Sequence, residues 1–133
     1  MLKLSKKWSY AVKAVIYIAV SWEWLVRVWD IAKDEDISES LLRRIISDLE
    51  KVHILETHKW RNGGVKLWKL PNQISTYDIL ESIGEELSIT DCTRWMDCDK
   101  HSSCSTTNLF WSLQNGFNTL LKIYTLDKIL KNR

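Results

Sequence analysis

The sequence predicts a mostly helical fold with one small β-hairpin, followed by a long helix that pairs two copies of the chain. Three observations predict it. A clean helical periodicity runs over residues 38–52, two strand-like runs flank residues 61–64, and an apolar helical stripe runs over residues 109–124. With 133 residues, the chain has room for one compact domain or a small domain with an appendage.

Composition excludes several classes of protein. Apolar residues make up 45 % of the chain and charged residues 27 %, which excludes a disordered or fibrous protein. The longest apolar run, residues 14–20, is too short to cross a bilayer, and Lys13 interrupts the stretch that a signal peptide needs. We therefore expect a cytoplasmic protein without a membrane partner.

The N-terminal elements follow from local patterns. Residues 10–20 are apolar nearly all round and predict a helix buried on most sides. Residues 25–28 are a candidate short strand, and residues 29–33 predict a short helix that the acidic residues 34–36 end. Ser38 is the predicted N-cap of the next helix.

The helix after Ser38 is strongly amphipathic. Its apolar residues fall within an arc of roughly 140°, and they are Leu41, Leu42, Ile45, Ile46, Leu49 and Val52. Hydroxyl and basic side chains, including Ser40, Arg43 and Arg44, occupy the opposite face. A short helix, a tight turn and such a second helix describe a helix-turn-helix, with two adjacent helices of any small helical protein as the alternative.

A basic hairpin follows. The runs 54–60 and 65–70 are strand-like, Asn62-Gly63 is a strong hairpin signal between them, and Pro71 ends the second run. This order of elements is that of a winged helix, whose wing tip presents Arg61 beside Lys59. Basic residues concentrate in residues 1–13 and 58–69, which carry no acid. This suggests a polyanion-binding face, although charge distribution without the other motifs would favour solvated lysines.

The second half of the chain predicts three more helices. Ser75 and Asp78 form a capping pattern for a helix that runs to about Leu87. A long helix begins near residues 106–107, and Thr125 caps a short one over 126–130. We divide the chain into a winged helix-turn-helix region (1–72), a connecting helix (73–91), a cysteine loop (92–105) and a dimerisation helix with its tail (106–133). A second copy is the economical partner for the long apolar stripe.

The cysteine loop is the candidate metal site. Three cysteines, Cys92, Cys98 and Cys104, are an odd number and cannot be a complete set of internal disulfides. Thiolates bind soft metals, so an iron–sulfur cluster, zinc and three metal-free thiols are the open alternatives. His101 would complete a zinc site with the three thiolates. No acid–base or nucleophile constellation is visible, so we expect no enzyme.

Taken in order, these motifs resemble the bacterial iron–sulfur transcription regulators typified by IscR and NsrR. The resemblance covers essentially the whole chain, through Leu4-Ser5-Lys6-Lys7-x-x-Tyr10-Ala11, Asp30-Ile31-Ala32, Ile37-Ser38-x-Ser40-x-Leu42, Leu49, Leu55, Arg61-x-Gly63-Gly64-x-x-Leu67, the cysteine loop and Thr125-Leu126-x-x-Ile129-Leu130. It implies a homodimer in which each subunit binds a [2Fe–2S] or [4Fe–4S] cluster. The cluster state then adjusts affinity for double-stranded promoter DNA in response to redox state, iron supply, oxygen or nitric oxide.

The resemblance also implies roles for residues. The cluster ligands are Cys92, Cys98 and Cys104, and the DNA-binding positions are Lys6, Ser38, Ser40, Arg43, Arg44, Lys59 and Arg61. Where IscR proteins carry a fourth, histidine ligand this chain has Thr107, and the aspartate of NsrR proteins corresponds to Ser9 or a neighbour. Ser9, His101, Thr107, a water or a small molecule are therefore the candidates for the fourth ligand.

Three expectations remain. Trp8 and Trp95 are expected in the environment of the cluster, whereas Trp29, Trp68 and Trp111 are expected to be packing residues. Arg43 stands where IscR relatives tend to carry glutamate, which predicts a different operator because arginine donates to guanine. The alternative functions are a zinc-stabilised winged-helix DNA-binding protein without cluster sensing and a winged-helix protein–protein adaptor.

Overall fold

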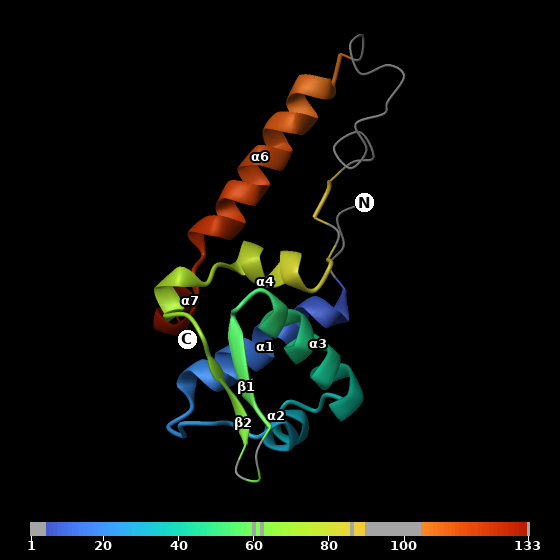
Figure 1. Cartoon of the computed structure of the whole chain (residues 1–133). Coiled ribbons are helices and arrows are strands. Elements are labelled where there is room, and N and C mark those ends of the chain that lie inside the picture. The colour runs from blue at the N-terminus through green and yellow to red at the C-terminus, as the bar shows by residue number, and fades with distance from the viewer. Residues whose placement is uncertain (1–4, 60, 62, 86, 90–104, 133) are drawn as a thin grey trace.

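The computed structural model describes residues 5–59, 61, 63–85, 87–89 and 105–132. Its elements are α1 (Lys6–Val20), α2 (Val28–Asp34), α3 (Glu39–Lys51), β1 (Leu55–His58), β2 (Gly64–Leu67), the 3₁₀ turn η1 (Pro71–Gln73), α4 (Thr76–Ser82), α6 (Thr107–Ile123) and α7 (Leu126–Lys131). Helices α1–α3 and the hairpin form one body, from which α6 extends away (Figure 1). The predicted mostly helical fold with a small antiparallel wing is confirmed.

Helix α1 is the centre of the core. It begins at Lys6, four residues earlier than predicted, and packs against α3, α4 and β2. Ala11 and Ala14 are fully buried, and their small side chains leave room for these neighbours. Within the described ranges, no helix is both long enough and apolar enough to span a bilayer.

Helices α2 and α3 form the predicted helix-turn-helix. Asp36 adopts a φ of 53° in the turn between them, a left-handed conformation that aspartate tolerates better than most residues. The predicted cap is confirmed, because Ser38 Oγ accepts a hydrogen bond from the Leu41 N–H at 3.2 Å. Val52, which the periodicity placed in the apolar arc of this helix, is exposed, because α3 ends one residue earlier and the chain turns at His53.

The wing pairs β1 with β2 in antiparallel register from Leu55↔Leu67 to His58↔Gly64. The strand expected over residues 25–28 is reduced to Val26, because α2 already begins at Val28. Val26 exchanges two backbone hydrogen bonds with Val65, at 2.9 and 2.8 Å. A Cβ on Gly64 would lie 2.7 Å from the Val26 carbonyl oxygen, so this position requires glycine.

Helix α4 is shorter than predicted. Ser75 and Asp78 form the expected reciprocal capping box, but α4 ends at Ser82 instead of near Leu87. Gly84 adopts a φ of 74° and closes the helix in a Schellman motif. In this motif the Glu85 N–H donates to the Leu80 carbonyl and the Gly84 N–H to the Glu81 carbonyl, both at 3.1 Å.

Two of the tryptophans that were expected to be packing residues are instead exposed to solvent. Trp29 is 56 % exposed and Trp68 is 55 % exposed. Trp29 lies on the outer side of the short helix α2, with the Lys33 ammonium 5.1 Å from its ring centre. Trp68 follows the last residue of β2 and rests against the His53 ring, 4.9 Å away. Trp111 is partly buried.

The C-terminal helix returns to the body. Leu126, at the start of α7, is fully buried, and its N–H donates to the Ile74 carbonyl at 2.8 Å. The Thr76 N–H donates to the Tyr124 carbonyl at 3.0 Å, and Ser75 pairs with Thr125. The two ends of the segment from α4 to α6 are therefore held side by side.

Candidate nucleic-acid interface

The outer face of α3 carries the residues expected to read DNA. Ser38, Ser40, Arg43 and Arg44 are all exposed, because the opposite face of the helix is buried against the core. The Ser38 and Ser40 hydroxyls lie 3.4 Å apart at the start of the helix. Four polar side chains, two of them cationic, thus stand on one solvent-facing surface of a single helix.

Arg43 is held by a neighbour on its own helix. Its Nη2 lies 2.7 Å and its Nε 3.2 Å from one carboxylate oxygen of Glu39, one turn earlier. Both side chains remain exposed, so the pair is a surface ion pair of modest strength. A phosphate or a guanine edge would have to compete with Glu39 for this guanidinium.

The wing and the helix-turn-helix together enclose a hollow of about 380 Å³. Arg43 lines it from α3, His58 and Lys59 line it from the wing, and Arg27 and Trp29 line it from the start of α2. The structure therefore brings together Arg43 and Lys59, which the sequence predicted separately. Arg27 and Trp29 were not expected here, and the placement of Arg27 immediately before α2 is the only signal that points to it.

A second basic hollow lies on the other side of α3. Lys7 from α1 and Arg44, Ser47, Asp48 and Lys51 from α3 line about 430 Å³. Arg44, Ser47 and Lys51 are spaced three and four residues apart, which places them along one face of the helix. Lys6 is exposed at the first residue of α1, but its neighbour Lys7 lines the hollow.

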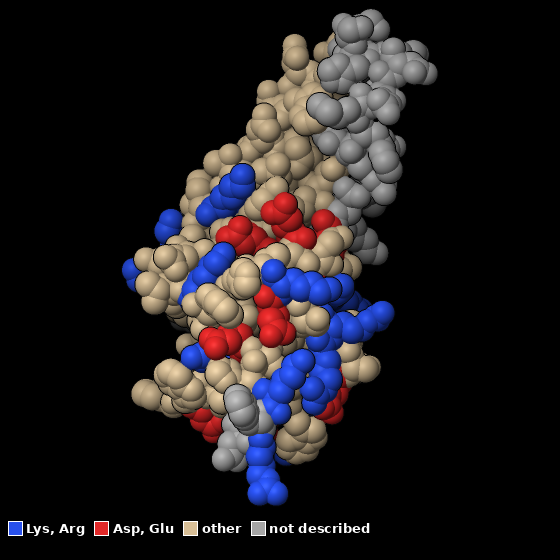
Figure 2. All heavy atoms as spheres, viewed as in Figure 1, with Lys and Arg blue, Asp and Glu red and all other residues tan. Residues whose placement is uncertain are grey.

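The wing tip completes the basic surface. Lys59 and Arg61 are both exposed near the turn of the hairpin. Figure 2 shows that Lys and Arg side chains gather over the α3 and wing part of the body, whereas the visible part of α6 carries few charges. Such a surface attracts the phosphates of a nucleic acid, whose neutralisation dominates binding affinity.

The candidate metal ligands Cys92, Cys98, Cys104 and His101, together with Trp95, lie outside the described residues. Among the residues that are described, no three His, Cys, Asp or Glu side chains are grouped to hold a metal ion. The other two candidates are placed: Ser9 is partly buried in α1, and Thr107 is buried at the first residue of α6.

Trp8 is partly buried and packs against the core, and its predicted place in the cluster environment stays a prediction. Its indole Nε1 is buried and has no hydrogen-bond partner among the described residues. An unpartnered buried donor is uncommon in folded proteins. It fits a nearby acceptor that the described residues do not supply, such as the sulfur atoms of a thiolate-bound cluster.

Gln114 fixes the approach to the cysteine loop. This residue of α6 is buried, and its side chain bonds to the backbone on both sides of Ser88. The Ile89 N–H donates to Gln114 Oε1 at 2.8 Å, and Gln114 Nε2 donates to the Leu87 carbonyl at 2.8 Å. Both hydrogen-bonding groups of the amide are used, so the segment before residue 90 has a defined register on α6.

Comparison with known sequences places these features in context. A sequence model of the Rrf2 family, described as iron-dependent transcriptional regulators, matches residues 4–132. The chain is 30 % identical to protein Aau3 of Rhizobium meliloti, over 99 % of this chain and 87 % of that protein. It is 26 % identical to the HTH-type transcriptional regulator NsrR of Bacillus licheniformis, over 99 % of this chain and 94 % of that protein.

Solved structures share the fold. CymR, the global cysteine regulator of B. subtilis, superimposes with a TM-score of 0.81 at 22 % identity, over 100 % of this chain and 99 % of that one. T. potens IscR superimposes with a TM-score of 0.77 at 25 % identity, over 98 % of this chain and 88 % of that one. The winged-helix architecture is therefore confirmed.

Proposed function

Because the chain belongs to the Rrf2 family of transcriptional regulators, we propose that it is a homodimeric DNA-binding regulator controlled by an iron–sulfur cluster. The cluster is held by Cys92, Cys98 and Cys104, one cluster per subunit. The observation that carries the DNA-binding part is the hollow that Arg43 of α3 and Lys59 of the wing both line. The family description as iron-dependent supports the cluster.

In this proposal α3 enters the major groove. Its exposed N-terminal residues Ser38, Ser40 and Arg43 reach base edges, as in other helix-turn-helix proteins. Arg44 and the wing residues Lys59 and Arg61 contact phosphates, which position the protein without reading sequence. Exchange of the Glu39 carboxylate for a guanine edge gives Arg43 a bidentate partner and specifies a G·C pair.

The donor set fits an iron–sulfur cluster better than it fits a closed zinc site. Three thiolates are available in one loop, and the six-residue intervals differ from the short Cys-x2-Cys spacing of structural zinc. When bound, a cluster supplies redox and ligand-exchange chemistry at iron. By the family resemblance, Ser9 and Thr107 stand where relatives carry a fourth ligand, and a weak hydroxyl ligand there would leave the cluster reactive toward oxygen or nitric oxide.

The dimer rests on the exposed face of α6. Five apolar residues along this helix and its C-cap are about half exposed, namely Leu109, Leu113, Leu120, Ile123 and Tyr124. Gly116 lies within the same stripe and has open space where a Cβ would stand. A second α6 packed on this face would bury the stripe, and Gly116 would let the two backbones approach closely.

Anaerobic purification tests the proposal. We expect visible absorbance, with two irons and two sulfides per subunit for a [2Fe–2S] cluster or four of each for a [4Fe–4S] cluster, and loss of absorbance, iron and sulfide in Cys98→Ser. Ser103→Ala is the matched control in the same loop and retains them. Fluorescence anisotropy with a duplex selected from a random-sequence pool should give an affinity that falls steeply with salt and that differs between cluster-loaded and cluster-free protein.

Three results would contradict parts of this proposal. If the protein is colourless and contains zinc that is lost in His101→Ala, the site holds a structural zinc ion and the proposed cluster is contradicted. If the protein contains iron but its DNA affinity is the same with and without the cluster, the sensing role is contradicted. Weak, salt-insensitive association with DNA removes the regulator itself and favours a protein–protein adaptor.

A further inference from the structure

The segment that leads from α4 toward the cysteine loop contacts the DNA-binding body through the buried Ile83 side chain and a small set of polar bonds. We define this segment, Ile83–Glu85 and Leu87–Ile89, as the strap. It begins at the Schellman turn around Gly84 and ends at Ile89, three positions before Cys92 in the sequence. Its outer half is fixed to α6 by Gln114.

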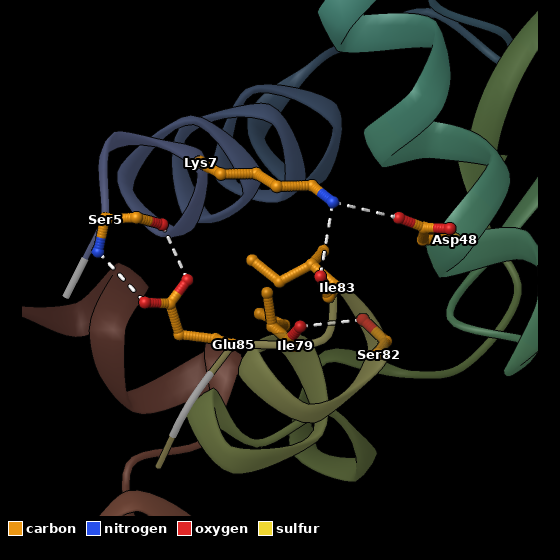
Figure 3. Close-up of polar contacts among 7 residues, drawn as sticks. All are labelled: Ser5, Lys7, Asp48, Ile79, Ser82, Ile83 and Glu85. Carbon is orange, nitrogen blue, oxygen red and sulfur yellow. Dashed lines mark hydrogen bonds and ion pairs between the residues drawn. The ribbon is translucent and has the colours of Figure 1, made fainter.

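The inner half of the strap is fixed to the start of α1. The Ser5 N–H donates to Glu85 Oε1 at 3.0 Å, and the Ser5 hydroxyl donates to Glu85 Oε2 at 2.6 Å. A carboxylate with both oxygens on the N-cap residue satisfies donors that the helix leaves open and complements the helix dipole. Figure 3 shows Glu85 reaching toward Ser5 from the end of α4.

Lys7 extends this contact to the DNA-reading helix. Its ammonium lies 3.2 Å from the Ile83 carbonyl oxygen and 3.4 Å from Asp48 Oδ2 of α3. Figure 3 shows the Lys7 side chain lying between the strap and α3. Lys7 and Asp48 are both partly buried, and Ile83 belongs to the core. A single cation is therefore bonded to the strap and to α3 at the same time.

We propose that Lys7 is the positioning residue through which the cysteine loop sets the placement of α3. This inference deepens the proposed function and rests on it for the identity of the signal. A change in the cysteine loop moves the strap about the left-handed turn at Gly84. The strap carbonyl at Ile83 and the Asp48 carboxylate share the Lys7 ammonium, so displacement of one shifts the other.

The coupling is tested without DNA or a cluster by a double-mutant cycle. Gly84→Ala strains the strap at a φ of 74° and meets no neighbouring atom, so its effect enters through the hinge. We expect it to speed amide hydrogen exchange in α3 by about threefold or more in the Lys7 background. In the Lys7→Met background, Gly84→Ala should leave the rate of amide hydrogen exchange in α3 nearly unchanged. The same fold-change in both backgrounds, or none in either, overturns the proposal.

A second measurement separates coupling from DNA contact. Lys7 also lines the basic hollow beside Arg44, so Lys7→Met lowers DNA affinity if it touches phosphate. The coupling predicts a change in a different quantity, the fold difference in DNA affinity between cluster-loaded and cluster-free protein. In Lys7→Met this difference should be smaller than in wild type by about fivefold or more, with the iron content unchanged. Asp48→Asn should lower the ratio similarly, and Lys13→Met, an exposed α1 control, should retain it.

The two proposals fail in distinguishable ways. A wild-type protein that binds no cluster, or whose two forms bind DNA equally, contradicts the sensing function, and the hydrogen-exchange cycle then still decides the role of Lys7. A normal wild-type ratio that Lys7→Met and Asp48→Asn leave intact contradicts the positioning role alone.

Discussion

At the scale of single residues, three cations of the candidate interface are already paired with acids of the same chain. Arg43 is paired with Glu39, Arg27 with Asp30 and Lys7 with Asp48. These pairs are solvent-accessible and contribute little to stability. Their consequence is for recognition, because each cation is oriented before DNA arrives and each acid is a local competitor for it.

Tyr17 gives a prediction about pH. Its hydroxyl donates to Asp34 Oδ2 at 2.5 Å, which joins α1 to the end of α2. This hydrogen bond raises the pKa of Tyr17 from 10.0 to about 12, with smaller contributions from burial and neighbouring acids. The neutral phenol therefore stabilises the fold below pH 10, and this contribution is lost as the pH rises from 10 toward 12.

Urea unfolding across this pH range tests the assignment. Wild-type stability should fall more steeply between pH 10 and 12 than that of Tyr17→Phe, and phenolate absorbance should show a late-titrating tyrosine that the variant lacks. Tyr77→Phe is the control and should keep the wild-type profile. Parallel profiles for wild type and Tyr17→Phe would show that the bond to Asp34 does not persist in solution.

At the scale of elements, the wing depends on one close backbone approach. Gly64 ends the register of β2 against β1, and its α-carbon faces the Val26 carbonyl. Val26 adds a third backbone pair to the two-stranded sheet through Val65. The wing is thereby fixed to the segment that enters α2, so wing and helix-turn-helix are positioned together.

Substitution of Gly64 should loosen this junction. In Gly64→Ala a Cβ would lie 2.7 Å from a backbone oxygen, and we expect destabilisation of about 1–3 kcal/mol. Chemical denaturation measures this change, with Lys13→Ala as an exposed control expected within about 0.5 kcal/mol of wild type. Unchanged stability in Gly64→Ala would mean that the Val26–Val65 pairing is not rigid.

The sequence predicted those elements that local physics determines. The stripe of α3, the Ser38 cap and the Asn-Gly hairpin are local signals, and the structure confirms α3, the cap and the paired strands. Trp29 and Trp68 were misassigned because hydrophobicity alone does not say which side of a short element faces solvent. Lys7, Arg27 and Gln114 acquire their roles from residues distant in the chain, and no local pattern marks such partners.

At the scale of the whole molecule, the exposed stripe of α6 leads to a prediction about assembly. Leu113→Glu should weaken self-association by about 100-fold or more, because each copy loses a buried leucine worth about 1.5–3 kcal/mol. Analytical ultracentrifugation measures the dimer fraction, and Asn115→Glu, exposed on the same helix away from the stripe, is the control.

Gly116 sharpens that test. On a solvent-facing helix, Gly116→Ala would stabilise the protein, because alanine favours helix by about 1 kcal/mol. At a close helix–helix contact the added methyl groups would instead weaken the dimer. Reduced self-association of Gly116→Ala supports the close-contact dimer, and unchanged association with higher thermal stability contradicts it.

The backbone bonds of Ile74, Thr76, Tyr124 and Leu126 have a consequence for the length of the chain between them. They hold the two ends of the segment between Thr76 and Tyr124 together, independently of the residues between them. Loop-closure entropy grows slowly with length, by about 0.6 kcal/mol for each doubling. Insertions or deletions between residues 89 and 105 therefore cost the body little stability, so the body can tolerate connections of very different length.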